Sequence, residues 1–261
     1  ISIGLVGSEM CIRDSTNASC SNQIGTGTKA SFEAAGITAS VSANSATSIY
    51  AQAFDSLGNE SNCTLLTSYT HDNTGPSAPS FSSITPASPN NSSTTPDLVG
   101  ASSGDTVSVE AFSDSSCTVS IGTGTKALFE GAGISLSVTA NTTSTIYLRA
   151  QDALGNTSAC TFMTNYTHDT VDPTDVTAVN DGVNSTSVTA SPTLSWSSAS
   201  DATSGIARYE VSLGTSAGDT STLNWTDVGV TTSTTITSIA PNLNSGTVSY
   251  THLRAHETDR Y

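Results

Sequence analysis

Apolar and polar residues alternate with a period of two along much of this chain. The alternation is clearest in the segments 105–112, 133–140 and 145–152. A period of two is typical of a strand with one buried face. Turn-forming runs such as SSGD, NTTS and ALGN interrupt it, and no segment keeps a helical period over three turns. The pattern therefore predicts an all-β chain. Residues expected on the buried faces are Val107, Val109, Ala111, Ile134, Leu136, Val138, Ile146, Leu148 and Ala150.

The chain contains an internal repeat. Residues Cys20–Asp72 align without a gap on Cys117–Asp169, an offset of 97 residues, and 32 of the 53 aligned positions are identical. A unit of this length has the size of a β-sandwich module, which is about 100 residues. We therefore expect tandem β-sandwiches in which each module contacts mainly its neighbours.

The two ends of the chain are related through their coding sequence. One choice of codons for LVGSEMCIRD, residues 5–14, has a reverse complement that translates in frame as VSYTHLRAHE, residues 248–257. This relation resembles translated sequencing adapter that flanks an insert in both orientations. We therefore set 1–15 and 248–261 apart as adapter-like artefact before considering the fold. His252 and His256, spaced as if on one face of a helix, are then not expected to form a metal site.

The remaining insert is strongly acidic. Four basic residues stand against 18 carboxylates, a net charge of 4 − 18 = −14. This balance argues against nucleic acid, because binding a phosphate backbone relies on Lys and Arg, and against insertion into or attraction to anionic membranes. The abundance of β-branched residues favours strands. A disordered stalk would share the composition but not the alternation.

Several motifs in 76–171 resemble those of bacterial immunoglobulin-like (Ig-like) repeats of large surface proteins: TPASPNNSSTTPDLVG, SSCTVSIGTGT, IYLRAQDALGNTSAC and THDTVDP. Further along, TLSW and ARYEVSLGT resemble the second and third strands of a fibronectin type III-like module. The resemblance implies tandem Ig-like and fibronectin III-like β-sandwiches. We expect a partial Ig-like module at 16–74, a complete one at 75–172 and a truncated fibronectin III-like module at 173–247.

Four cysteines remain once Cys11 is assigned to the adapter-like segment. Repeat symmetry favours two disulfides, Cys20–Cys63 and Cys117–Cys160, among three possible connectivities. Two free thiols per module are the alternative, and zinc is disfavoured because no C-x2-C pair or nearby His supports it. Paired cysteines would imply an oxidising compartment, and therefore export to the cell surface or the extracellular space.

Acidic residues near the expected module junctions are candidate calcium ligands. Turn chemistry explains DSLGN at 55–59 and DALGN at 152–156, because Asp accepts backbone hydrogen bonds and Gly tolerates positive φ. The alternative is calcium, which takes six to eight oxygen ligands. The candidate ligands are Asp72, Asp105 and Asp152 at the first junction and Asp169, Asp172 and Asp201 at the second.

Two further motifs invite a catalytic or phosphate-binding interpretation. His71 and His168, each followed by Asp, stand at the exits of the last strands of the repeat, and no G-x-S-x-G elbow marks a nucleophilic Ser. We expect solvated linker histidines and no catalytic residue. The GTGTK segments at 25–29 and 122–126 lack the spacing of a phosphate-binding loop and are expected to be turns between strands.

These interpretations indicate a non-catalytic structural or adhesive repeat segment, a stalk or spacer, of a large exported bacterial surface protein. Its partners would be neighbouring modules of the same chain, and surface glycans or proteins bound through regions outside this sequence. The alternatives are a module that itself binds glycans or proteins, and an accessory region of a secreted hydrolase. The first two modules contain no Trp and few rings that we expect to be exposed, which favours the spacer. Apart from calcium, no cofactor is expected.

Overall fold

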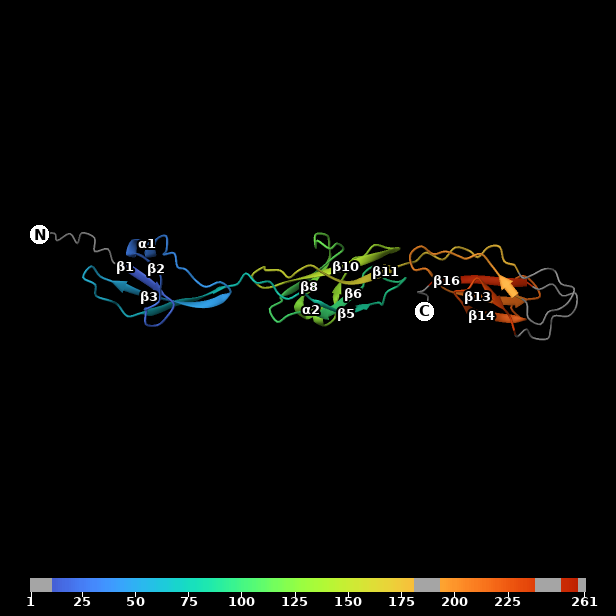
Figure 1. Ribbon diagram of the computed structural model, residues 1–261, viewed down its shortest axis with the longest axis horizontal. Coiled ribbons are helices and arrows are strands. Elements are labelled where there is room, and N and C mark those ends of the chain that lie inside the picture. Colours follow the sequence, from blue (N-terminus) through green and yellow to red (C-terminus); the bar gives the residue numbers. More distant parts are fainter. Residues whose placement is uncertain (1–10, 181–192, 238–249, 258–261) are drawn as a thin grey trace. The chain divides into compact units, whose positions relative to one another are not determined.

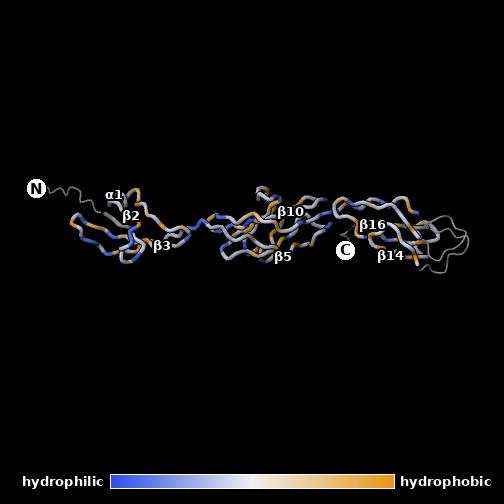
Figure 2. Tube along the Cα trace, in the orientation of Figure 1, coloured by the Kyte–Doolittle hydropathy of each residue, from blue (hydrophilic) through white to orange (hydrophobic). Residues whose placement is uncertain are grey.

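The computed structural model describes residues 11–180, 193–237 and 250–257 (Figure 1). Its strands are antiparallel, and its helices are two segments of five residues. The chain divides into two compact units. Unit 1 comprises Ile1–Gly75 with Asp152–Thr157, and unit 2 comprises Pro76–Gln151 with Ser158–Tyr261. Figure 2 shows hydrophobic and hydrophilic residues interleaved along the strands, as the period of two requires.

Unit 1 contains one four-stranded sheet in the order β2-β1-β3-β4. The helix α1 begins after Thr28, whose side chain accepts a hydrogen bond from the Ser31 N–H and so caps its first turn. Among the described residues of this unit, no second sheet covers the first. Its elements are β1 (Cys11–Ser15), β2 (Gln23–Thr28), α1 (Lys29–Glu33), β3 (Ser45–Phe54) and β4 (Thr64–His71).

The first part of unit 2 is a sandwich of two sheets, β5-β6-β9 and β11-β10-β7-β8. Its core lies between them and includes Leu98, Phe129, Ile146 and Tyr166, all with no exposed surface. The β7–β8 and β10–β11 hairpins repeat the pairing of unit 1 in the same register, 97 residues on. The elements are β5 (Ser80–Thr85), β6 (Asp97–Ala101), β7 (Ser108–Phe112), β8 (Ser120–Thr125), α2 (Lys126–Glu130), β9 (Ile134–Ser135), β10 (Thr142–Gln151) and β11 (Thr161–His168).

The second part of unit 2 has two further sheets, β12-β15 and β14-β13-β16. Leu194, Trp196, Tyr209 and Val211 belong to their common core, in which the Trp196 and Tyr209 rings meet edge to face at 5.7 Å. Strand β16 lies in the segment set aside as adapter-like, as does β1. The elements are β12 (Thr193–Ser195), β13 (Ile206–Gly214), β14 (Leu223–Gly229), β15 (Ser233–Thr235) and β16 (Tyr250–Glu257).

The strands predicted from alternation are present, and the all-β prediction is confirmed. Ile146, Leu148 and Ala150 are fully buried on β10, and Val109 and Ala111 on β7. Val107 precedes β7 and is exposed, contrary to the pattern. Only the first two residues of 134–138 form a strand, although Leu136 is buried and Val138 packs against the core.

The expectation that the GTGTK segments are turns was wrong. Both form strands, β2 and β8, that end at the cap of a short helix. In β8 a Cβ at Gly122 would lie 2.6 Å from the Ser135 carbonyl oxygen, and one at Gly124 would clash with the Ile134 side chain. The glycines therefore allow a close approach between β8 and the β9 segment rather than a change of chain direction.

The expectation of solvated histidines was also wrong for His168. This residue ends β11 and is 5% exposed. Its Nδ1 accepts a hydrogen bond of 3.2 Å from the Asn141 N–H, which holds the turn before β10 against the end of β11. His71 makes the equivalent bond with Asn44 at 3.1 Å and is half-buried. Both histidines therefore act as structural acceptors at the end of a hairpin.

Candidate functional site

Three carboxylates come together in unit 2: Asp169, Asp201 and Glu257. One ligand oxygen from each lies within 4.8 Å of the others. Asp169 directly follows β11, Asp201 lies in the segment between β12 and β13, and Glu257 ends β16. Asp169 and Glu257 are buried and Asp201 is half-buried. Like charges this close disfavour full ionisation unless a proton or a cation lies among them.

Backbone donors organise the two aspartates. Asp201 Oδ1 accepts hydrogen bonds from the N–H groups of Thr203, Ser204 and Gly205 at 2.8–3.0 Å. Asp169 Oδ2 accepts from the Ser204 N–H at 3.0 Å, and its Oδ1 accepts from the Val171 N–H at 3.0 Å. Desolvation raises the pKa of Asp201, but these backbone donors outweigh it and the pKa lies below its ordinary value. Asp201 is therefore held as a carboxylate beside Asp169.

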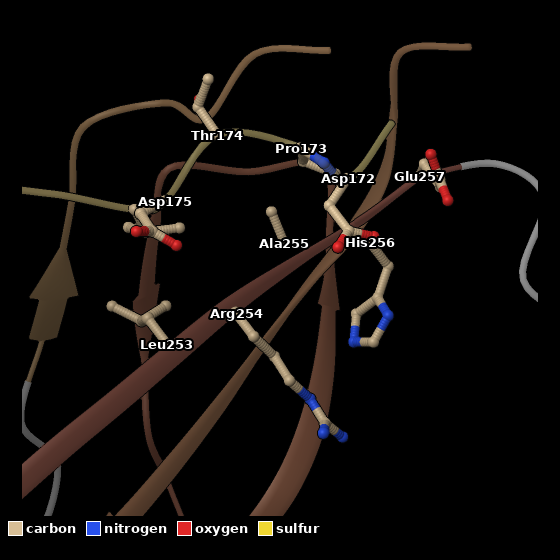
Figure 3. A pocket seen from close by; sticks show the side chains of 10 residues that line it. Asp172, Pro173, Thr174, Asp175, Leu253, Arg254, Ala255, His256 and Glu257 are labelled. Carbon is tan, nitrogen blue, oxygen red and sulfur yellow. The ribbon is translucent and has the colours of Figure 1, made fainter. Parts of the chain in front are cut away.

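A shallow depression of about 350 Å³ lies beside this cluster (Figure 3). It is lined by the segment 172–176 and by residues 253–257 of β16. Figure 3 shows the Arg254 and His256 side chains extending the same way from β16, and both reach Glu210 on β13. The distances to Glu210 Oε2 are 2.6 Å from Arg254 Nε and 3.0 Å from His256 Nε2. The depression is therefore built partly from the adapter-like segment.

The predicted second-junction ligands are thus partly brought together. Asp169 and Asp201 belong to the cluster, whereas Asp172 lines the neighbouring depression. Glu257, the third member of the cluster, was not among the predicted ligands because its segment had been set aside. A pairing of β16 with β13 along eight residues of the strand brings it there, and no local motif could have indicated this.

The predicted first-junction ligands make local bonds. Asp152 Oδ1 accepts hydrogen bonds from the Leu154 and Asn156 N–H groups at 2.8 and 2.9 Å, and the Asn156 side chain donates to Oδ2. These bonds, with that of the Asn156 side chain foremost, lower the pKa of Asp152. Asp72 accepts from the Thr74 N–H at 2.9 Å, and Asp105 from the Ser103 hydroxyl. The turn chemistry expected for DALGN is confirmed, while calcium at either junction stays a prediction.

Both predicted disulfides are present. Cys20–Cys63 and Cys117–Cys160 each span 43 residues, with Cα atoms 5.8 and 5.9 Å apart. The interpretation as four free thiols was therefore wrong. Cys20 and Cys117 lie in the loops that follow β1 and β7. Cys63 and Cys160 lie just before β4 and β11. This connection ties the two hairpins of each module to each other.

An aromatic and ionic strip crosses the outer face of the sheet β11-β10-β7-β8. The Tyr147 and Phe162 rings meet edge to face at 5.9 Å, and Phe162 is half exposed. Arg149 lies 4.8 Å over the Phe112 ring and 3.3 Å from Glu110. Sequence reasoning expected few exposed rings and missed this strip, although Tyr147 on β10 stands between the core positions Ile146 and Leu148.

No helix among the described residues is long and apolar enough to cross a membrane.

Comparison with known proteins finds distant structural similarity alone. No family model matches the chain, and no curated protein matches its sequence. Among solved structures, the FN1–FN3 domains of chicken CNTN1 are similar over 97% of this chain and 86% of that chain, at 15% sequence identity and a TM-score of 0.37. A likeness this distant carries no argument about function, so what this chain does has to be inferred from its own residues.

Proposed function

We propose that this chain is a non-catalytic spacer segment of a large exported bacterial surface protein. The observation that supports this most is the tandem repeat, because 32 of 53 aligned positions are identical, β2, β3 and β4 correspond to β8, β10 and β11, and both copies form the same disulfide. Repeated modules with their own cross-links are suited to holding a distance under mechanical and chemical stress. Two disulfides also support export to an oxidising compartment.

The parent reading frame gives the direct test. Expression of the parent gene with one 97-residue unit deleted should leave export unchanged and reduce the reach of whatever domain the array carries. The readout is labelling of an epitope tag on intact cells together with an adhesion assay at graded surface distances. A catalytic domain in the same frame, with the array required for turnover on an insoluble substrate, would overturn the spacer in favour of an accessory region of a hydrolase.

Binding of a glycan or a protein is the second candidate, and the aromatic strip supports it. Of its rings, Phe162 is 51% exposed, whereas Phe112, which lies under Arg149, is buried. An exposed aromatic ring on a sheet face is a group that can anchor a partner. A glycan and peptide array probed with the chain should then give a signal that Phe162→Ala removes. Leu154→Ala, which changes a side chain 64% exposed on a loop, is the matched control. If neither array gives a signal, the binding function is rejected and the spacer is the remaining proposal.

We also propose that 1–15 and 248–261 are foreign to the natural protein. The antisense relation between the two ends is the main support. A second support is that Asp14 replaces, at the repeat offset, the core residue Ala111. Asp14 is 4% exposed with one carboxylate oxygen unpaired, and burial raises its pKa. Resequencing of the source nucleic acid with a library that lacks the adapter should give different sequence in place of 1–15 and 248–261. Recovery of both segments unchanged would contradict this proposal.

A further inference from the structure

We propose that the first sandwich of unit 2 is built to resist force and opens only in part when its two ends are pulled apart. A clamp, defined as the contact between residues 88–93 and residues 166–169, resists the pull. Once the clamp breaks, the Cys117–Cys160 bridge keeps the chain between the two cysteines from extending. The inference deepens the proposed spacer function and rests on it for its use in the natural protein.

The path of the chain brings its entering and leaving segments together. The sandwich begins at Pro76 and its last strand, β11, ends at His168. The first strand, β5, is an edge strand that pairs with β6 in the sheet that does not contain β11. The entering chain then reaches the other sheet, where Asn90 forms a parallel bridge with His168. The two segments that receive a pull from opposite ends therefore lie side by side.

Backbone hydrogen bonds join the two segments of the clamp. The Asn90 N–H donates to the Thr167 carbonyl, and the Asp169 N–H donates to the Asn90 carbonyl, both at 2.9 Å. The Thr167 N–H donates to Ser88 Oγ at 2.8 Å. Three bonds are thus concentrated on a few residues at the place where the entering chain meets the leaving chain.

Tyr166 adds a bond from within the core. Its hydroxyl donates to the Ser93 carbonyl at 2.9 Å, and its ring has no exposed surface. Asn90 Oδ1 accepts hydrogen bonds from the N–H groups of Ser92 and Ser93 at 2.8 and 2.9 Å, which holds the turn that presents this carbonyl. The clamp is therefore anchored in the packed core as well as along the edge of β11.

The direction of the two segments decides how these bonds are loaded. Both segments run the same way, because their bridge is parallel. A pull on the entering end draws residues 88–90 backward along their own axis, and a pull on the leaving end draws β11 forward. The segments must slide past each other, so the bonds are loaded together and not one after another. Resistance to force then depends on the rate at which this contact breaks, since forced unfolding is governed by the unfolding rate.

The disulfide separates loaded chain from unloaded chain. After the clamp breaks, the pull passes along the chain to Cys117 and crosses the bridge to Cys160, 43 positions further on. The elements β8, α2, β9 and β10 lie between the two cysteines. Their backbone carries no tension while the bridge is intact, because the covalent path bypasses it. A stretched module therefore lengthens only by the parts that flank the bridge.

The bridge sets a length that can be measured. When it is broken, the 43 positions join the stretched chain and add about 150 Å to its extended length, at roughly 3.5 Å per residue. This difference does not depend on the distance between the ends of the folded module. An array of bridged modules would accordingly lengthen in short steps under load.

Single-molecule force spectroscopy on the full chain tests the bridge. Handles attached through unnatural amino acids at Ser77 and Val171, both exposed, load this sandwich and leave the rest of the chain outside the path. We expect an opening step that is longer by about 150 Å in Cys117→Ser with Cys160→Ser than in the bridged chain. Steps of equal length would overturn the limiting role of the bridge.

Two serines give a matched pair of variants that test the clamp. Ser88 accepts a hydrogen bond from the Thr167 N–H at 2.8 Å, and Ser158 accepts one from the Ala150 N–H at 2.9 Å, but Ser158 lies between the bridged cysteines. Ser88→Ala should shorten the lifetime of the closed module at constant force about fivefold, the effect of one ordinary hydrogen bond. Tyr166→Phe should act in the same direction, whereas Ser158→Ala should leave this lifetime unchanged.

Urea unfolding of the same variants shows that they fold and separates mechanical from thermodynamic effects. Ser158→Ala and Ser88→Ala should both lower the free energy of unfolding, although only Ser88→Ala shortens the lifetime under force. Equal lifetimes for these two variants, or an unchanged lifetime in both Ser88→Ala and Tyr166→Phe, would overturn the clamp. Neither result would reject the spacer, which the deletion of one 97-residue unit tests, because a module that resists force elsewhere still holds a distance.

Discussion

Phe129 and Phe32 occupy the same position of the repeat and have opposite environments. Each is the fourth residue of a short helix that follows a GTGT strand. Phe129 lies under β6 with no exposed surface, whereas Phe32 is 39% exposed because its unit has no equivalent of β6 among the described residues. At the residue scale, therefore, the same side chain contributes to stability only where a second sheet removes it from water.

Replacing each phenylalanine by alanine separates these environments. Phe129→Ala should lower the stability of the β10–β11 hairpin by about 3–5 kcal/mol, because it opens a cavity in a packed core. Phe32→Ala should change that of the β3–β4 hairpin by less than about 1 kcal/mol. Hydrogen exchange resolved by peptide measures both free energies in one chain. Equal losses of stability in Phe129→Ala and Phe32→Ala would show that the two phenylalanines are equally buried, which would contradict this prediction.

Glu130 makes the stability of unit 2 depend on pH. Hydrogen bonds from Lys126 and Ser102 lower the pKa of Glu130 from its ordinary value of 4.5 to about 2. Because the folded state has the lower pKa, this contribution is present above pH 4.5 and is lost as the pH falls toward 2. Thermal melts over this range should show a fall in the midpoint that Glu130→Gln reduces. An identical pH dependence in the variant would contradict this role.

At the scale of the elements, each copy of the repeat contains two hairpins tied by a disulfide. Cys117 lies in the loop between β7 and β8 and Cys160 lies just before β11, so the bridge joins hairpins that also pair through β7 and β10. The Asp114 side chain holds the cysteine loop by accepting hydrogen bonds from the N–H groups of Thr118 and Val119. The bridge therefore adds a covalent link to a connection that backbone pairing already makes.

Removing the bridge tests its share of the stability. Because the two cysteines are 43 positions apart, Cys117→Ser with Cys160→Ser should lower the free energy of unfolding by roughly 4 kcal/mol in the chain-entropy estimate. Urea unfolding, followed by exchange of the β10 amides, measures this loss. Before that, mass spectrometry after alkylation without reduction should leave both cysteines unmodified in the unchanged chain, and alkylation of both would refute the bridge.

At the scale of the molecule, the acidic cluster of unit 2 links the end of β11 to the segment before β13 and to β16. Asp169 and Asp201 were predicted as calcium ligands, and hard carboxylate oxygens in this number suit that ion. Asp169 ends the first sandwich of unit 2, and Asp201 belongs to the second. A cation bound by both would therefore join the two sandwiches. Calcium would then stiffen the array, as the proposed spacer requires.

Calcium should therefore raise the melting temperature of unit 2. At a concentration 100 times the Kd, a single site adds about 2.7 kcal/mol to the free energy of unfolding. Differential scanning calorimetry with calcium or a chelator measures the effect, and Asp201→Asn should remove it. Glu257→Gln distinguishes a calcium site of the natural protein from one that the adapter-like segment creates. A natural site should still raise the melting temperature with calcium when this residue of the adapter-like segment is replaced. A melt unchanged by calcium would end this prediction.

The all-β fold, the positions of the main strands and both disulfide pairs could be predicted from the sequence. Period-two alternation and repeat symmetry are local or internal signals, so they need no knowledge of the partner sheet. The GTGT strands and the buried His168 could not be predicted, because glycine and histidine owe their roles to neighbours in the fold: Ser135 and Ile134 for the glycines, and Asn141 for the histidine. Glu257 joined the cluster through a long-range strand pairing.

The sequence by itself determined which residues alternate, which cysteines are equivalent and which side chains recur 97 positions apart. The tertiary structure alone decided that Tyr166 is core while the identical Tyr69 is surface, and that Asp169 and Asp201 approach each other while Asp172 lines the neighbouring depression. The physical reason is that alternation specifies two faces of a strand, whereas burial and close approach depend on which other segment packs against each face.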